Sequence, residues 1–359
     1  MLMFAHTKKL AAIYMPTIDV SVIKAYTDFR IRRWTIGFLF FTIICIFLFN
    51  FVPHVRAYYL TSFSPNDLPL PQAFRCSHKN RTRLDYGRQH LAASRVIICA
   101  MIRDRETQVP RIRRQIEEIT RLFADYVIVI VENDSRDRTR QELISWAQDK
   151  KVAGRIHVIG CGHVVNDDRP CNLSMAPTAP NHRPDMSRIE KMVLLRNIYM
   201  EYIEHNSQLA NFDYVIVQDF DLRTYTYTDG LLSSGFHFGN DPTIDAICAN
   251  GIYHDIVFGS KKYFDPYAHK DEQNEKWSTL YNDLWSAFFR YYPCDSNLVR
   301  VKSCFSGRTM YRYKSIKEKR YRTYPDAFQQ AVCEHVGFHE ALSIYLNSEM
   351  IFYIRENNR

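Results

Sequence analysis

Two carboxylates one residue apart, Asp219 and Asp221, follow a short apolar segment, Tyr214–Val217. An unbroken run of Val and Ile is typical of a strand buried on both faces of a sheet. Residues i and i+2 of an extended chain point the same way, so we expect both carboxylates to face one spot beyond the strand. Two hard oxygen ligands there suit Mg²⁺ or Mn²⁺ carrying a diphosphate. The alternative is an exposed acidic turn.

A second polar turn, residues 131–139 with the sequence VENDSRDRT, follows another apolar segment. Glu132 and Asp134 stand at the end of that predicted strand, where carboxylates can accept hydrogen bonds from ribose hydroxyls or a base edge. The alternative is an Asx turn in which Asp137 caps the next helix. The two interpretations are compatible.

The predicted elements that position these residues alternate along the chain. Apolar segments predict strands at Arg95–Met101, Tyr126–Val131, Arg155–Ile159 and Tyr214–Val217, and amphipathic patterns predict helices at Val109–Phe123, Asp137–Lys150 and Ile189–His205. This order predicts an α/β fold with a mostly parallel sheet and helices on both faces. Gly160–Arg188 is expected to be a long polar loop, a length typical of functional or disordered segments.

The order of strand, acidic turn, helix with Arg196-Asn197 and D-x-D strand resembles the nucleotide-sugar-binding half of glycosyltransferases of the GT-A fold, which is Rossmann-like. The resemblance covers roughly Arg95–Arg223. It implies that Asp219 and Asp221 hold the metal and the donor diphosphate.

The same resemblance assigns further donor contacts. Glu132 and Asp134 would contact the nucleoside, Arg196 would approach the phosphates, and Arg103 at the end of the first strand joins the donor-binding set. The alternative for Arg196 is an ordinary surface arginine on a helix.

A further likeness extends to the fungal cryptococcal capsule-associated alpha-mannosyltransferases. The chain is similar to them in the E-x-x-S-x-D-x-T turn, the L-R-N helix, Cys248-Ala249 followed by Phe264-Asp265, and the segment Val301-Lys-Ser-Cys-Phe-Ser-Gly307. That family has Asn-Asp-Val where this chain has Asp219-Phe-Asp221. The resemblance therefore implies the reaction class and not mannose as the donor sugar.

Near the C-terminus, His335 and His339 are one helical turn apart in the sequence CEHVGFHE. A late histidine often completes the metal shell in the GT-A fold, so the resemblance makes both histidines candidate ligands. Glu334 is a candidate catalytic base if the reaction inverts the anomeric centre and the carboxylate reaches the acceptor hydroxyl. The alternative is two partly exposed helix histidines. The order differs from the H-E-x-x-H of zinc proteases, which excludes that class.

The N-terminal part predicts a membrane anchor. Residues 34–52 carry no charge and are long enough to span a bilayer. Residues 1–33 hold six Lys or Arg against two Asp, which predicts a cytoplasmic N-terminus. The length of the run disfavours a signal peptide, and its lack of a polar stripe disfavours a core helix. We therefore expect a cytoplasmic tail at 1–33, a signal-anchor at 34–52, a stem at 53–92 and a lumenal catalytic domain at 93–359, divided into a nucleotide-sugar-binding half, 93–223, and an acceptor-side half, 224–359.

Eight of the nine cysteines lie beyond the predicted anchor, and an oxidising lumen predicts at least one disulfide. The local pairs Cys161–Cys171 and Cys294–Cys304 are the first candidates. Cys99 and Cys248 lie in apolar segments and are interpreted as buried thiols. Asn80 and Asn172 begin glycosylation sequons that matter only in a lumenal domain.

The net charge of +8 is spread among acidic residues along the 359-residue chain, and no nucleic-acid module is present, so nucleic acid is not an expected partner. We predict a metal-dependent glycosyltransferase in the Golgi or another secretory membrane. It would use Mn²⁺ or Mg²⁺ to move a hexose from a nucleotide diphosphate sugar to a glycan or glycoprotein. The alternative is a non-catalytic lumenal sugar-binding or scaffold protein that retains the fold.

Overall fold

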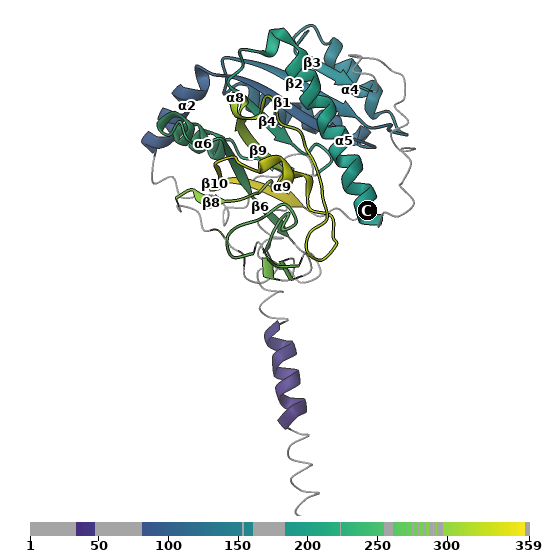
Figure 1. Ribbon diagram of the computed structural model, residues 1–359, viewed down its shortest axis with the longest axis vertical. Coiled ribbons are helices and arrows are strands. Elements are labelled where there is room, and N and C mark those ends of the chain that lie inside the picture. Colours follow the sequence, from purple (N-terminus) through teal and green to yellow (C-terminus); the bar gives the residue numbers. More distant parts are fainter. Residues whose placement is uncertain are drawn as a thin grey trace, which may run out of the picture. The chain divides into compact units, whose positions relative to one another are not determined.

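The computed structural model describes residues 34–46, 81–152, 154–160, 184–222, 224–254, 261–274, 276–278, 281–282, 285–286, 290, 292 and 297–355 (Figure 1). The chain separates into two compact units, Met1–Val55 and Arg56–Arg359. In the first unit, residues 34–46 form a helix whose side chains are almost all exposed. Within the described ranges, no helix is long and apolar enough to cross a membrane. Residues 47–52 of the predicted anchor lie outside those ranges.

A ten-stranded sheet forms the centre of the second unit. Its strands are β1 (Arg95–Ile102), β2 (Asp125–Glu132), β3 (Ile156–Ile159), β4 (Tyr214–Gln218), β5 (Thr224–Thr226), β6 (Ala246–His254), β7 (Lys261–Tyr263), β8 (Val299–Val301), β9 (Arg308–Arg312) and β10 (Ile344–Arg355). The order across the sheet is β3-β2-β1-β4-β9-β6-β10-β5, with β7 paired to β6 and β8 paired to β10.

The first four strands along the chain form a parallel half-sheet. β1 pairs in parallel with β2 and with β4, and β2 pairs in parallel with β3. The predicted strand–helix alternation is confirmed here, with boundaries close to those expected. Beyond β4 the sheet is mixed, because β9 runs antiparallel to both of its neighbours, β4 and β6. The expectation of a mostly parallel sheet is therefore wrong for the second half.

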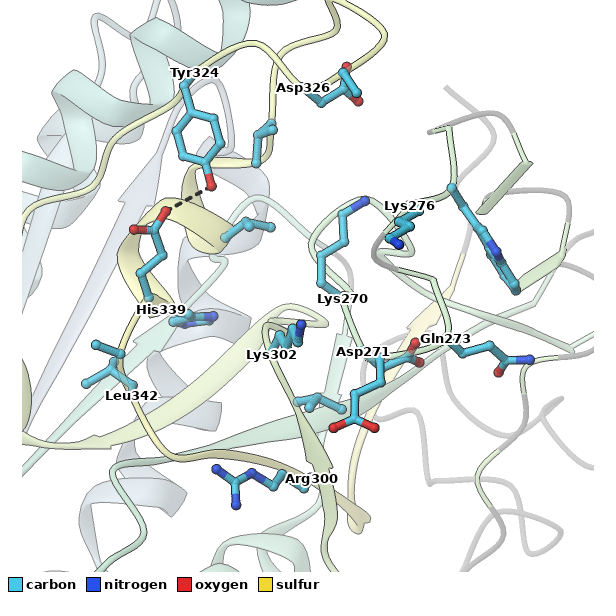
Figure 2. A pocket seen from close by; sticks show the side chains of 18 of the residues that line it. Lys270, Asp271, Gln273, Lys276, Arg300, Lys302, Tyr324, Asp326, His339 and Leu342 are labelled. Carbon is cyan, nitrogen blue, oxygen red and sulfur yellow. Dashed lines mark hydrogen bonds between the residues drawn. The ribbon is translucent and has the colours of Figure 1, made fainter.

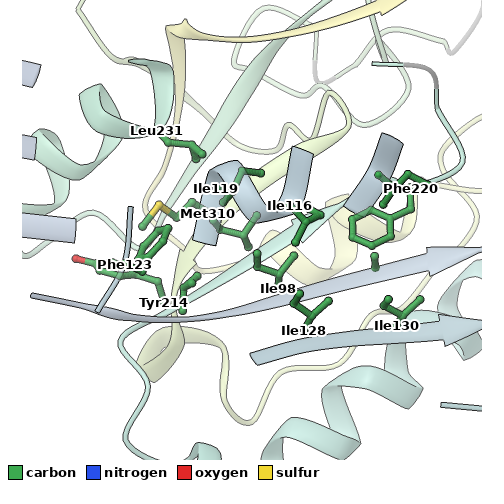
Figure 3. Close-up of a cluster of buried hydrophobic side chains, with 14 of the residues drawn as sticks. Ile98, Ile116, Ile119, Phe123, Ile128, Ile130, Tyr214, Phe220, Leu231 and Met310 are labelled. Carbon is green, nitrogen blue, oxygen red and sulfur yellow. The ribbon is translucent and has the colours of Figure 1, made fainter. Parts of the chain in front are cut away.

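Helices cover both faces of the sheet, as predicted. They are α2 (Arg81–Ala92), α3 (Val109–Thr120), α4 (Thr139–Gln148), α5 (Pro184–His205), α6 (Thr228–Asn240), α8 (Tyr313–Ile316) and α9 (Glu334–His339). Side chains alternate along β1: Ile98 belongs to a core cluster with Ile116 of α3 (Figure 3), whereas Cys99 belongs to a second cluster with Tyr199 of α5. Two apolar layers therefore hold the sheet between them.

The folded part begins earlier than the sequence suggests. The predicted stem extends to residue 92, but residues 81–92 form α2, which packs against α6. Leu91 is completely buried, and a Cβ added at Gly87 would lie 1.9 Å from the carbonyl oxygen of Leu232. Arg83 also forms an ion pair with Glu349 of β10. The sequence gives only a weak signal for this helix, because Gly87 and Leu91 are its only buried residues and several prolines precede it.

A disulfide joins Cys248 of β6 to Cys304, which precedes β9. This corrects two expectations, because Cys248 is not a free thiol and Cys304 is not paired with Cys294. β6 and β9 are adjacent in the sheet, which brings two cysteines separated by 56 residues to a Cα–Cα distance of 5.9 Å. Cys99 is a buried free thiol, as expected. Three other predictions concern residues outside the described ranges: the Cys161–Cys171 pair and the sequons at Asn80 and Asn172.

Gly307, next to β9, has a φ of +82°, and a Cβ there would lie 2.1 Å from the ring of Phe352. We expect Gly307→Ala to combine backbone strain with overpacking and to lower the free energy of unfolding by about 2–4 kcal/mol. Gly154→Ala is the matched control, because Gly154 has a φ of +78° with nothing within 4 Å. It should cost only about 1 kcal/mol. Equal losses in urea unfolding would contradict the steric argument.

Candidate active site

A pocket of about 270 Å³ lies where β1 and β4 end. β2 and β4 flank β1 on opposite sides, so the strand order reverses at β1. Open α/β sheets bind ligands in the crevice outside such a reversal. The polar side chains in the lining are Arg103, Asn133, Arg188, Arg196, Asp219, Asp221, Asp265, Tyr267, Glu334 and His335. Six of the residues proposed from the sequence therefore line one pocket.

Asp219 and Asp221 both line this pocket because the alternation of β4 continues past its end. Phe220, between them, is 1% exposed and packs in the core with α3. The backbone N–H of Asp219 donates to the carbonyl oxygen of Gly307 at 3.0 Å, which fixes the turn against β9. The side chain of Asp219 is 20% exposed, and Asp221 is exposed.

Arg196, on α5, is buried, whereas the other two described arginines of the pocket, Arg103 and Arg188, are half-buried and exposed. Its Nε donates to Glu334 Oε1 at 2.9 Å, and its Nη2 donates to Asp219 Oδ1 at 3.4 Å. The guanidinium carbon also lies 4.9 Å from the ring centroid of Phe305 and 5.6 Å from that of Tyr321. Arg196 is therefore not the exposed helix arginine that the alternative interpretation required.

The pocket concentrates negative charge around this one guanidinium. Burial raises the pKa of Asp219 well above its usual value. Arg196 opposes the rise, and the carboxylates of Asp221, Asp265 and Glu334 add to it. A cation entering the pocket would relieve this repulsion.

The sequence indicates Asp265 only as part of a Phe-Asp pair. Its φ of +67° is uncommon for a residue with a Cβ. Its carboxylate accepts hydrogen bonds from the N–H groups of Ala268 at 3.3 Å and Ser306 at 3.2 Å. Burial, then the nearby Glu334, raises its pKa to about 7. The Phe-Asp pair was the only sign in the sequence that Asp265 has a role. Nothing in the sequence indicates that Asp265 lines the same pocket as Asp219 and Asp221.

The structure separates the two histidines that the sequence placed on one helix face. His335 lines the pocket, stacks on Phe305 with ring centroids 3.9 Å apart, and has no hydrogen bond at either ring nitrogen among the described residues. His339 points elsewhere. Its Nδ1 pairs with Ser303 Oγ at 3.0 Å and its Nε2 with the Tyr311 hydroxyl at 2.7 Å. Both rings are buried rather than partly exposed.

The residue types in the pocket fit a divalent ion. Asp219 and Asp221 supply carboxylate oxygens, and His335 supplies unengaged ring nitrogens. Burial keeps His335 neutral by lowering its pKa well below the usual value, which suits a metal ligand. In the described part of the chain, no three His, Cys, Asp or Glu side chains are gathered closely enough to hold a metal. These three side chains therefore line one pocket without forming a closed coordination shell among the described residues.

In the acidic turn after β2, Asn133 lines the pocket, whereas the expected residues Glu132 and Asp134 do not. Glu132 is 1% exposed, accepts from Arg140 Nε at 2.5 Å and from the Ser135 N–H at 2.7 Å, and does not line the pocket. Asp134 is also outside the lining, 4.0 Å from Arg140. Asn133 lies between them in the pocket, and its buried Oδ1 has no hydrogen bond among the described residues.

The mixed α/β sheet, covered by helices on both faces, thus holds an acidic pocket beyond its strand ends, where open α/β sheets bind ligands. The family described as Cryptococcal mannosyltransferase 1 matches residues 95–340, more than half of the chain. The chain belongs to this family, and the match supports a glycosyltransferase that uses a nucleotide sugar.

Among solved structures, the chain is similar to the mannosyltransferase PcManGT from Pyrobaculum calidifontis in complex with GDP-Man and Mn²⁺. The identity is 11%, the alignment covers 88% of this chain and 68% of that chain, and the TM-score is 0.39. A TM-score this low supports no inference about the site. No curated protein matches the chain in sequence.

Arg196→Gln removes the buried cation and leaves Glu334 and Asp219 without their partner. Breaking a buried ion pair in this way costs about 3–5 kcal/mol, and we expect a loss of that size in the free energy of unfolding. The double variant Arg196→Gln/Glu334→Gln should recover much of it, because the second change removes one of the stranded charges. Urea unfolding measures both. A single variant as stable as the wild type would contradict the pairing.

His339→Gln tests a pH dependence. Burial, then Lys319 and Arg196, lowers the pKa of His339 to about 3, against about 6.5 in an unfolded chain. Between these values the unfolded chain binds a proton that the folded chain does not. The free energy of unfolding therefore falls as the pH falls from about 6.5 towards about 3. The variant should flatten this slope by up to about 1.4 kcal/mol per pH unit. An unchanged slope would show that His339 does not stay neutral.

Proposed function

We propose that this protein is a metal-dependent glycosyltransferase that moves a hexose from a nucleotide diphosphate sugar to a glycan or glycoprotein acceptor. The observation that carries the proposal is the pocket at the strand-order reversal, where Asp219, Asp221 and His335 line the same space as Arg196. Membership of the Cryptococcal mannosyltransferase 1 family makes mannose the first hexose to test.

Asp219, Asp221 and His335 would hold Mn²⁺ or Mg²⁺. When bound, such an ion neutralises charge on the leaving diphosphate. Arg196 holds Asp219 in place through their hydrogen bond and opposes the rise in its pKa that burial causes. Arg103, half-buried in the lining, adds positive charge on the side of β1 and suits a contact to the anionic donor.

The nucleoside contact expected from Glu132 and Asp134 is better supported for Asn133. Glu132 would have to leave Arg140 to reach a ligand, which would strand a buried charge. Asn133 already lines the pocket with an unengaged buried carbonyl oxygen among the described residues. An amide can both donate to and accept from a ribose or base edge.

Two carboxylates are available to receive the proton of the acceptor hydroxyl. Glu334, expected from the sequence, already accepts a hydrogen bond from Arg196 Nε at 2.9 Å, so this carboxylate is engaged within the protein. Asp265 has a pKa raised to about 7 by burial, which suits proton transfer near neutral pH. Asp265 is therefore the better candidate for a base, and Glu334 is better placed to orient Arg196.

We also propose a type II membrane topology, with the catalytic domain in the lumen of the Golgi or another secretory compartment. The charge asymmetry around residues 34–52 supports this orientation. The Cys248–Cys304 disulfide supports an oxidising compartment.

A panel of nucleotide sugars that includes GDP-mannose tests the function, with Mn²⁺ present and after chelation. Asp219→Asn and Asp221→Asn should each lower the rate of transfer at least 100-fold, because several kcal/mol of charge stabilisation is lost and about 1.4 kcal/mol corresponds to tenfold. His335→Gln should weaken Mn²⁺ binding measured directly by calorimetry. His339→Gln is the matched control and should bind Mn²⁺ like the wild type.

The outcomes separate the alternatives. Transfer that persists in chelator would exclude the metal. A folded protein that neither transfers nor hydrolyses any donor in the panel would favour the non-catalytic sugar-binding or scaffold protein. Misfolding of both Asn variants would show that Asp219 and Asp221 are structural carboxylates.

A further inference from the structure

A second and larger cavity, of about 1260 Å³, lies beside the same short helix α9 (Figure 2). Glu334 and His335 of α9 line the first pocket, whereas Val336 and His339 line this cavity. The two spaces are therefore separated by a helix of six residues, roughly 9 Å long at 1.5 Å per residue.

The cavity gathers cationic side chains from two backbone segments that pair with each other. Arg300 and Lys302 flank the buried Val301, so they project to the same exposed side of β8. The N–H of Lys302 donates to the carbonyl oxygen of Lys270 at 2.8 Å, which sets Lys270 beside them. Lys276 is exposed in the turn that follows, and Figure 2 shows these side chains around one space.

Most carboxylates in the lining are engaged by the protein. Asp271 accepts from Arg290 Nη1 at 3.1 Å, and Glu340 forms an ion pair with Arg322. Asp326 accepts from two backbone N–H groups of its own loop. Neither Arg290 nor Arg322 lines the cavity, so these contacts offset negative charge without using its cations.

With Arg290 and Arg322 counted, six cationic side chains stand against the four carboxylates of the lining, and this excess favours an anion. Glu272 is the fourth carboxylate of the lining and is exposed. Among the described residues, neither Lys276 nor Arg300 forms an ion pair. Both are exposed, so their charges are available to a ligand at the mouth of the cavity.

Aromatic side chains complete the lining. Tyr324 and Phe328 are 39% and 52% exposed, and Trp277 is half-buried. Trp277 packs edge-on against Trp285, with centroids 5.5 Å apart, which fixes its plane. Aromatic faces pack well against the C–H face of a pyranose ring. Cations and aromatic rings together are suited to a charged sugar chain.

We infer that this cavity binds an acidic glycan, an oligosaccharide that carries carboxylate or phosphate groups, and that this glycan is the acceptor of the proposed transfer. The role as acceptor rests on the proposed function; the binding of the anion does not. A sugar at Asp265 in the first pocket belongs to a chain that crosses α9 and places its acidic groups near Lys276 and Arg300.

Calorimetry on the full chain without any donor tests the inference. The probes are tetragalacturonate, its fully methyl-esterified neutral form, and a mannose tetrasaccharide bearing a phosphate monoester. The two anionic probes distinguish a carboxylate from a phosphate as the recognised group. We expect at least one of them to bind about tenfold more tightly than the neutral ester, with an advantage that declines as salt is added.

Lys276→Glu/Arg300→Glu should remove this preference, and Lys276→Gln/Arg300→Gln should weaken it. Lys314→Glu/Lys317→Glu is the matched control, because these exposed lysines of the same unit line neither cavity, and it should bind like the wild type. Thermal unfolding confirms that each variant is folded. The inference is overturned if no probe binds, if the neutral ester binds as tightly as the anions, or if the Glu variant binds like the wild type.

Binding of GDP-mannose to the same variants keeps the two proposals apart. It should be unchanged in Lys276→Glu/Arg300→Glu. If no nucleotide sugar is bound or used while the anionic preference depends on Lys276 and Arg300, the glycosyltransferase proposal fails and the acidic-glycan site stands. If hexose is transferred equally to acidic and neutral acceptors, the acceptor role assigned here fails alone.

Discussion

The buried guanidinium of Arg196 is the interaction on which the arrangement of the pocket depends. It joins α5 to Glu334, which is 138 residues further along the chain, and to Asp219 at the end of β4. Taking a charge out of water is costly unless its partners are close and well aligned, so these segments are stable only in this relative arrangement. The guanidinium also lies over the aromatic rings of Phe305 and Tyr321. A single side chain thus joins elements that are far apart along the chain.

A second buried ion pair explains why the acidic turn differs from its expected role. Glu132 and Arg140 join the end of β2 to α4, with the side chains 1% and 8% exposed. The turn is consequently rigid, and Asn133 is its one member in the pocket lining. Acidic residues in a motif can therefore build the turn while a neutral neighbour faces the ligand.

The first half of the fold was predictable because its signals are local. β1, β2 and β4 are uninterrupted apolar runs, and α3 has isoleucines at helical spacing. The second half depends on contacts between distant residues. Nothing in the sequence indicates that β9 lies antiparallel between β4 and β6, and this placement decides that Cys248 pairs with Cys304.

The candidate site was predictable in the same uneven way. The D-x-D carboxylates needed only strand alternation, and the structure places both in the pocket. The sequence could not separate His335 from His339, because their surroundings come from Phe305, Ser303 and Tyr311, which arrive with β9 and the loop before it. The same loop brings Ser306 to Asp265 and Gly307 to Asp219. An antiparallel strand inserted beside β4 therefore returns the chain to the carboxyl end of the parallel half-sheet. For that reason late residues, and not only those near the D-x-D, complete the pocket.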